Sequence, residues 1–417
     1  MIDREKLNEI YKKAHQVIYN LSEFACQDSD AFRKVYEDEP RIRTPFAIDR
    51  DRILYSGAYR RYHGKTQVFS FSNMIDEEMT NRNLHTTYVS QIARTISKIL
   101  GLNLELVEAI ALGHDLGHTP FGHDGERALS KVCLKNGIGH FHHNIESLHI
   151  VDNISRKGKG LNLTFQVRDG IISHDGEVHN TKLMPKRDKT EDDINNYIKM
   201  RIKDRRGQTI NNPTNELTNN QPSYSHPINE GVRVSSIEQE PNMMPSTLEG
   251  CVVRISDTIA YIGQDIEDAI RYNFLKREEI PVDCRKHLGD TNSKIIDSLV
   301  KSVVVNSYEN DFICFDEETS EYLLKLKKFN YERIYTDYSI KKTNPKVEMC
   351  MDILFDKYMK DIANENRDSN VFKQFLSNKD ESYLNSFNDA EKVRDFIATM
   401  TDRYFNEEVK DFLLPWK

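Results

Sequence analysis

Apolar residues recur at steps of three and four along most of this chain, and this periodicity constrains the fold more than any other feature. In "LHTTYVSQIARTISKIL" (84–100), one helical stripe runs from His85 through Val89, Ile92 and Ile96 to Ile99. The segments "LELVEAIALGHDLGH" and "CVVRISDTIAYIGQDIEDAI" repeat the pattern. Only "LNLTFQV" (161–167) and "SVVVNSY" (302–308) favour short strands. The sequence therefore predicts a mainly α-helical fold.

The helical pattern is interrupted once by a long polar stretch. "RRGQTINNPTNELTNNQPSYSHPINEG" is rich in Asn, Pro, Thr and Gly and has almost no apolar rhythm. We predict an inserted, mobile loop over about 185–247 within a core spanning 1–275. A smaller helical region without an evident catalytic cluster is predicted for 276–417.

Charge and cysteine usage limit the class of protein. The net charge of −8 over 417 residues argues against general binding of nucleic acid or anionic membranes. The six cysteines show no CxxC pairing, which is typical of free thiols in a reducing cytoplasm. The chain starts with charged residues, and no apolar run approaches the roughly 18 to 20 residues that cross a bilayer. We expect a cytoplasmic protein with no membrane partner.

The stretch "HDLGHTPFGHDGE" (114–126) crowds three histidines among carboxylates. His114 and Asp115 follow a predicted helix, where a turn can direct both at one ion. His85 lies one turn before an apolar stripe and needs a buried partner, and Asp257 is a fourth candidate within an apolar helix. Two imidazoles and two carboxylates favour Mn²⁺ or Mg²⁺, with Fe, Ni or Zn as alternatives. Any one of these histidines alone would be read as an ordinary histidine; the set indicates a metal site.

The same stretch supplies a candidate acid/base pair. His123 and Glu126 lie three residues apart, on one side of a starting helix, where a carboxylate can orient an imidazole. Glu126 is equally typical of a first-turn acid that complements the helix dipole. His118 lies between the two groups and could contact phosphate. One of the three histidines in "FHHNIESLHI" could also reach the site, although surface positions fit the spacing equally well: His142, His143 and His149.

A basic segment precedes these motifs. Residues 41–69 hold six arginines and Lys65 in an otherwise acidic chain, and Arg82 lies within one helical turn of His85. Cations beside a divalent metal suit a polyphosphate, whose oxygens accept bidentate arginine contacts. A solvated face with structural ion pairs is the alternative for most of them. No GxxxxGK[ST] loop is present, so a nucleotide would not be held by a P-loop.

Six blocks in this order resemble one family, the HD-domain deoxynucleoside triphosphate triphosphohydrolases or dGTPase family. They are "RTPFAIDRDRILYSGAYRRYHGKTQVF", "RNLHT", "HDLGHTPFGHDGE", "FHHNIES", "LNLTFQVRDGIISHDGE" and "TLEGCVVRISDTIAYIGQDIEDAI". They cover most of residues 41–180 and 247–271. An HD dyad alone is a weak signal, but six ordered blocks are specific.

The resemblance implies roles at the matching positions. The metal would be bound by His85, His114, Asp115 and Asp257. The catalytic residues would be His123, Glu126 and His143. Gln67 and Asp265 would address the deoxyribose 3′-hydroxyl, Tyr261 would pack under the sugar and exclude a 2′-hydroxyl, and Arg82 would hold phosphate. Asp257, Tyr261 and Asp265 follow one another at steps of four, which independently predicts one helical face.

The resemblance therefore implies metal-dependent hydrolysis of dGTP or several dNTPs to the deoxynucleoside and inorganic triphosphate. An HD-domain 5′-nucleotidase, a phosphodiesterase or an alarmone hydrolase is the alternative within enzymes, and a non-catalytic nucleotide-sensing module is the alternative outside them. The partners it implies are a dNTP substrate, further copies of the chain in a homo-oligomer, and a nucleotide or single-stranded DNA effector.

Overall fold

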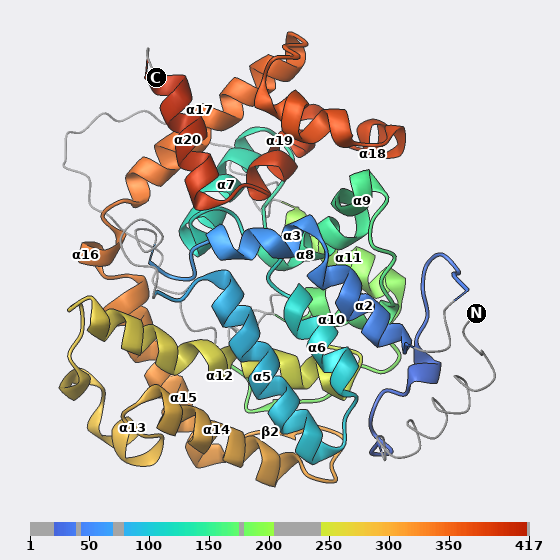
Figure 1. Cartoon of the computed structure of the whole chain (residues 1–417). Coiled ribbons are helices and arrows are strands. Elements are labelled where there is room, and N and C mark those ends of the chain that lie inside the picture. The colour runs from blue at the N-terminus through green and yellow to red at the C-terminus, as the bar shows by residue number, and fades with distance from the viewer. Residues whose placement is uncertain (1–20, 39–42, 70–78, 175–178, 204–242, 415–417) are drawn as a thin grey trace, which may run out of the picture.

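The computed structural model describes residues 21–38, 43–69, 79–174, 179–203 and 243–414. Helices account for most of this described part, and the strands in it form only one two-stranded pair (Figure 1). The predicted mainly α-helical fold is confirmed.

The helices up to the long central one are α2 (Pro45–Leu54), α3 (Gly57–Arg61), α5 (Arg82–Leu100), α6 (Leu104–Gly113), α7 (Gly122–Lys135), α8 (His143–His149), α9 (Ser155–Gly158), α10 (Phe165–Ile172), α11 (Glu191–Ile202) and α12 (Leu248–Arg271). Those that follow are α13 (Val282–His287), α14 (Asn292–Ser307), α15 (Glu317–Asn330), α16 (Tyr338–Lys341), α17 (Asn344–Ala363), α18 (Glu381–Ser386), α19 (Asp389–Ala398) and α20 (Asp402–Leu413). Shorter 3-10 or π-helical turns are η1 (Asp28–Asp30), η2 (Tyr62–Gly64), η3 (Ile150–Ile154), η5 (Arg277–Glu279), η6 (Tyr331–Tyr335), η7 (Val371–Phe375) and η8 (Leu376–Asn378). The strands β1 (Lys182–Leu183) and β2 (Ile313–Cys314) pair antiparallel.

The helices α5, α6 and α12 pack against one another and form the centre of the core. Asn81 caps α5 by accepting a hydrogen bond from the Leu84 amide, and Gly101 ends the helix in a left-handed conformation at φ 70°. The apolar stripe of α5 is buried as far as Ile96, but Ile99 is 48% exposed, so the stripe ends one turn earlier than its periodicity predicts.

Both predicted strands are wrong. Residues 302–307 belong to α14, where Leu299 and Val303 face the core at helical spacing and Val305 is 75% exposed. The β-branched run is overridden by the longer helical pattern around it. Residue Thr164 forms only an isolated bridge to Arg33, and α10 begins directly after it.

The predicted loop over 185–247 is wrong for its first part. Helix α11 lies within it and begins with a capping box between Thr190 and Asp193. Just before it, the Lys189 ammonium donates to Ser173 Oγ at 2.8 Å and to the Met244 carbonyl at 2.6 Å. Residues 204–242 of the predicted loop, and with them its expected mobility, lie outside the described residues.

The predicted C-terminal region packs directly on the core. Helices α14 and α15 lie against α12, and α17 lies against α7 (Figure 1). The boundary at 275 therefore stays a prediction. All six cysteines are free thiols, as predicted. Within the described residues, no helix combines the length and the apolar character that crossing a membrane requires.

Candidate metal and acid/base centre

Four side chains that are distant in sequence converge where α5, α6 and α12 meet. His85 lies in the first turns of α5, His114 and Asp115 follow the last residue of α6, and Asp257 lies within α12. His85 Nε2 is 3.0 Å from Asp257 Oδ1 and 3.7 Å from Asp115 Oδ2. His114 Nε2 is 3.4 Å from Asp115 Oδ2 and 4.0 Å from Asp257 Oδ1. The structure thus brings together the four predicted metal ligands.

The chemistry of these donors fits a divalent ion. His114 Nδ1 lies 2.7 Å from the Ala111 carbonyl and donates to it, so Nε2 is the ring atom that would bind an ion. That Nε2 atom is buried and has no hydrogen-bond partner among the described residues. Burial opposes ionisation of Asp115 and Asp257, but the charges of His114 and Arg82 hold the pKa of Asp115 well below its usual range, and the contact with His85 lowers that of Asp257 to about 2. Two ionised carboxylates beside an imidazole nitrogen that has no hydrogen-bond partner favour a cation at this point.

The Arg82 side chain is paired with Asp115, one of the predicted metal ligands. Its guanidinium is buried and lies 2.6 Å from Asp115 Oδ2, and it also donates to the carbonyls of Thr66 at 3.2 Å and Gln67 at 3.3 Å. Gly122 has a φ of 55°, and a Cβ there would lie 3.0 Å from the Gln67 carbonyl oxygen, so this close approach requires glycine. Arg82 therefore orients Asp115 in this structure, and its contact with phosphate stays a prediction.

A second cluster gathers around the carboxylate of Glu126. Its oxygens accept hydrogen bonds from His123 Nδ1 at 3.2 Å, from His143 Nδ1 at 3.0 Å and from the backbone amide of His143 at 2.8 Å. Burial opposes ionisation, but the two imidazoles hold the pKa of Glu126 well below its usual value. The His123 side chain is 41% exposed, against 13% for Glu126 and for His143, so it is the most accessible of the three to a water or a substrate.

His118 joins the two clusters. Its Nε2 atom is 3.1 Å from Asp115 Oδ1, and its ring stacks on His143 with centroids 4.1 Å apart. Burial, followed by the charge of Arg82, holds the pKa of His118 well below its usual value, so the ring is neutral. The Lys65 ammonium fixes this loop by donating to the His118 carbonyl. Whether His118 contacts phosphate stays a prediction.

The structure adds one histidine that the sequence reasoning missed. His174 Nε2 lies 3.2 Å from His143 Nε2 and 3.8 Å from Asp115 Oδ1, while its Nδ1 atom donates to the Ile171 carbonyl at 2.6 Å. Burial and the neighbouring His114 and His143 lower its pKa to about 4. One signal could have found it, because the tetrapeptide His-Asp-Gly-Glu at 123–126 recurs at 174–177.

The other two histidines of "FHHNIESLHI" lie elsewhere. His142 Nε2 is 3.2 Å from the Arg201 carbonyl on α11, and His149 Nε2 is 2.9 Å from Asp395 on α19. Of the three, only His143 reaches the centre.

The predicted sugar side lies farther along α12. Tyr261 is half-buried, whereas Asp265 is buried and its Oδ2 atom accepts a hydrogen bond of 2.5 Å from the Tyr335 hydroxyl. Burial raises the pKa of Asp265 to about 7, with Asp268 adding to the effect. Gln67 offers a buried amide oxygen that no described residue pairs with. Their roles toward a sugar stay predictions.

The region after residue 276 contributes contacts to Asp265 and to helix α7, although the sequence indicated no catalytic cluster there. Tyr335 comes from η6, and α16 and α17 supply Lys341 and Asn344, which contact the Asp124 carboxylate at 2.9 and 3.1 Å. Asp124 lies in the first turn of α7, beside His123. The C-terminal region therefore helps to hold the helix that carries the acid/base pair.

Comparisons with known proteins identify two family models and several relatives over most of the chain. The family model described as HD domain matches residues 84–262, and the one described as Phosphohydrolase-associated domain matches residues 313–411. The chain is 34% identical to a deoxyguanosinetriphosphate triphosphohydrolase-like protein of Caldanaerobacter subterraneus, over 95% of this chain and 93% of the relative. Proteins described by the same words are 32% identical in Desulfatibacillum aliphaticivorans, over 92% of each chain, and 30% identical in Clostridium perfringens, over 99% of this chain and 96% of the relative. The similarity thus extends well beyond the six sequence blocks.

Proposed function

Because the chain belongs to the family of deoxyguanosinetriphosphate triphosphohydrolase-like HD-domain proteins, we propose that it hydrolyses 2′-deoxynucleoside triphosphates to the deoxynucleoside and inorganic triphosphate. One observation carries the proposal. The four metal-site residues and the pair formed by His123 and Glu126 form one continuous network, joined through His118 and Asp115.

A divalent ion, Mn²⁺ or Mg²⁺ first, held by His85, His114, Asp115 and Asp257, would polarise an α-phosphate oxygen and offset the charge that develops in the transition state. Arg82 would hold Asp115 in place through its contact of 2.6 Å.

The residues around Glu126 would handle the attacking water. His123 would accept a proton from this water as its oxygen forms a bond to the α-phosphorus. Glu126 would keep the His123 ring oriented and would stabilise the imidazolium that results. The bond between the α-phosphorus and the sugar 5′-oxygen would break, and the 5′-oxygen would take up a proton to give the deoxynucleoside.

Selection of the sugar is proposed for the far part of α12. Tyr261 would close the space beside C2′, and Gln67 and Asp265 would pair with the 3′-hydroxyl. The unpaired oxygen of Gln67 and the accepting carboxyl of Asp265 support this assignment, because both can accept a hydrogen bond from a hydroxyl group. A binding pocket built in this way discriminates against a ribonucleotide by steric exclusion.

The test is to incubate the Mn²⁺-loaded chain with each dNTP and each matching NTP and to identify the products by mass. We expect intact triphosphate from dNTPs and at least tenfold less turnover of NTPs. Monophosphate with pyrophosphate, or equal turnover of both sugars, would contradict the proposal.

His123→Ala should abolish turnover without changing the metal content. The matched control is His142→Ala, because His142 is also a half-buried histidine but faces α11. Full activity of His123→Ala would remove this residue from the mechanism.

A further inference from the structure

Two buried charged side chains connect the C-terminal helices to the turn that precedes α7, and neither takes part in the proposed mechanism. Asp402 is the first residue of α20. Lys65 directly precedes Thr66 and Gln67, whose carbonyls accept hydrogen bonds from Arg82. Both charged side chains are almost completely buried. Burial of a charge is unfavourable unless polar groups of the protein stabilise it, so the contacts of these two side chains indicate what they hold in place.

The Asp402 carboxylate joins two segments that are distant from it in sequence. Its Oδ1 atom accepts a hydrogen bond of 2.9 Å from the Phe121 amide. Its Oδ2 atom accepts one of 3.0 Å from the Thr66 amide and another from the Thr66 hydroxyl. Thr401 already caps α20 by accepting from the Tyr404 amide at 3.2 Å, so the helix does not need Asp402 as its cap. The carboxylate therefore holds the segments around Thr66 and Phe121.

The contact with Phe121 lies two residues before His123. Phe121 has a left-handed backbone conformation at φ 66°, which bulky residues rarely adopt, and its side chain makes no capping hydrogen bond to α7. Such a conformation persists where surrounding contacts enforce it. Asp402 supplies one of these contacts from 281 residues farther along the chain. The start of the helix that carries His123 and Glu126 is thus held by a group of the C-terminal region.

The contact with Thr66 reaches the metal centre. The Thr66 carbonyl accepts from the Arg82 guanidinium at 3.2 Å, and the same guanidinium lies 2.6 Å from Asp115 Oδ2. Only Thr66 and Arg82 separate the Asp402 carboxylate from a predicted metal ligand. A displacement of Asp402 would therefore be transmitted to both clusters of the candidate site.

Lys65 makes a second connection between the same parts of the fold. Its ammonium donates to the His118 carbonyl and, at 2.8 Å, to the Ala398 carbonyl at the end of α19. The preceding residue, Gly64, lies so close to α20 that a Cβ there would be 2.8 Å from the Thr401 side chain, and this close approach requires glycine. The segment that holds His118 is therefore pressed against the corner between α19 and α20.

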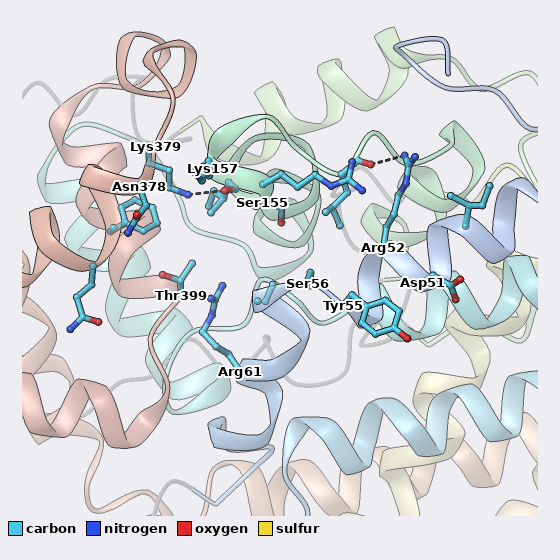
Figure 2. A pocket seen from close by; sticks show the side chains of 18 of the residues that line it. Asp51, Arg52, Tyr55, Ser56, Arg61, Ser155, Lys157, Asn378, Lys379 and Thr399 are labelled. Atoms are coloured by element: carbon cyan, nitrogen blue, oxygen red, sulfur yellow. Dashed lines mark hydrogen bonds between the residues drawn. The ribbon is translucent and has the colours of Figure 1, made fainter. Parts of the chain in front are cut away.

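The corner between α19 and α20 also borders a cavity of about 850 Å³ (Figure 2). Thr399, which follows α19, and Arg61, the last residue of α3, face each other there, and Lys379 lies farther along the cavity wall. None of the predicted metal-site or acid/base residues lines this cavity. Packing alone does not enclose the corner, so its position depends on the polar contacts of Asp402 and Lys65.

We propose that Asp402 and Lys65 are positioning residues for the hydrolysis. Asp402 holds the Phe121 backbone and thereby places His123, and Lys65 places His118. The inference rests on the proposed function, because correct placement of these groups is measured by turnover. A misplacement of about 1 Å caused by a mutation far from the chemistry can lower a rate about 100-fold. The corner between α19 and α20 is thus a working part of the catalytic unit.

The test compares kcat and KM for triphosphate release by the full chain carrying Asp402→Asn or Lys65→Met. Asparagine keeps the size of the side chain and one acceptor oxygen, but its NH₂ group cannot accept from a backbone amide. Methionine keeps most of the aliphatic stem of Lys65 and removes the donors. Glu408→Gln is the matched control, because Glu408 is also a buried acid of α20 but pairs with Tyr358 and Asn370.

We expect kcat to fall about 10- to 100-fold in Asp402→Asn and about 5-fold or more in Lys65→Met, because both lose contacts that orient the reacting groups. KM should stay within about threefold and the metal content should be unchanged, since the groups that bind substrate and metal are retained. Glu408→Gln should keep kcat within twofold of the wild type even where its melting temperature falls as far as that of Asp402→Asn.

Hydrogen exchange of backbone amides gives a readout that does not depend on turnover. Peptides covering residues 116–125 should exchange faster in Asp402→Asn and in Lys65→Met than in the wild type, and at the wild-type rate in Glu408→Gln. A role of Asp402 in the stability of α20 alone would instead raise exchange within α20 and leave residues 116–125 protected.

The proposal is overturned if Asp402→Asn and Lys65→Met keep kcat within twofold of the wild type, if Glu408→Gln loses as much kcat as they do, or if exchange of residues 116–125 is unchanged. Should Asp402→Asn fail to fold, the comparison of Lys65→Met with Glu408→Gln decides the question. A wild type that releases no triphosphate would contradict the proposed function instead, and the exchange measurement would then decide whether the two residues hold the turn.

Discussion

Replacing Glu126 by glutamine would test the acid/base cluster most directly. The carboxylate accepts from His123 at 3.2 Å, from His143 at 3.0 Å and from the His143 amide at 2.8 Å. An amide keeps one acceptor oxygen and gains an NH₂ group, which cannot accept from an imidazole N–H. One ring must therefore lose its partner or change tautomer, and the negative charge that stabilises the imidazolium is gone.

The size of the effect follows from these contacts. Loss of oriented acid/base chemistry reduces rates by about 10²–10⁴, which is roughly 3–5.5 kcal/mol of activation free energy. The glutamine oxygen can still accept two of the three hydrogen bonds. The free energy of unfolding should therefore fall by only about 1.5–3 kcal/mol, the contribution of one hydrogen bond to a charged group.

The assay measures kcat for triphosphate release at saturating dNTP, with metal content and unfolding free energy determined on the same preparations. Glu108→Gln is the control, because it makes the same change in a half-buried carboxylate that pairs with Arg94 at 2.7 Å. The reasoning is refuted if Glu126→Gln binds metal normally and retains kcat within threefold of the wild type.

Three further predictions concern protonation and metal. Burial raises the pKa of Glu249 to about 7 from 4.5, so between these pH values the folded state keeps a proton that the unfolded state has released. The free energy of unfolding should therefore fall by up to about 3 kcal/mol as pH rises from 4.5 to above 7. Denaturant unfolding should show this pH dependence in the wild type and not in Glu249→Gln, and an equal pH dependence in both would contradict the prediction. Burial raises the pKa of Asp265 to about 7, and the hydrogen bond from the Tyr335 hydroxyl opposes this rise. Tyr335→Phe should therefore move the acid limb of the kcat/KM profile to higher pH and raise KM about 5- to 20-fold, because one hydrogen bond is lost. An unchanged pH profile would count against a substrate role for Asp265. Chelation of the metal should abolish activity and lower the melting temperature, because an ion that binds only the folded state stabilises it by about 2.7 kcal/mol when the ion concentration is a hundred times its Kd. Addition of Mn²⁺ should restore both activity and melting temperature. A chelated protein that stays active and equally stable would exclude a metal from this centre.

The sequence by itself determined the helices that carry the site. Helical periodicity is a local property of about 10 to 20 residues, so it can be recognised in the sequence alone. It predicted the helix that carries His85, the helix that ends before His114 and the helix that contains Asp257. The convergence of these residues was predicted from donor chemistry and from the family resemblance. Periodicity misled where context outweighed it, as in the β-branched run 302–308, which continues a helix packed on α12.

Only the tertiary structure decided which groups meet across the chain. His174 joins the centre, Arg82 turns to Asp115, and Tyr335 from the C-terminal region reaches Asp265. The cavity lined by Arg61 and Lys379 likewise arises from α2, α3, α9 and the C-terminal helices together. No spacing in the sequence encodes these contacts, because each depends on how helices far apart in the chain pack and on which polar atoms that packing leaves without water.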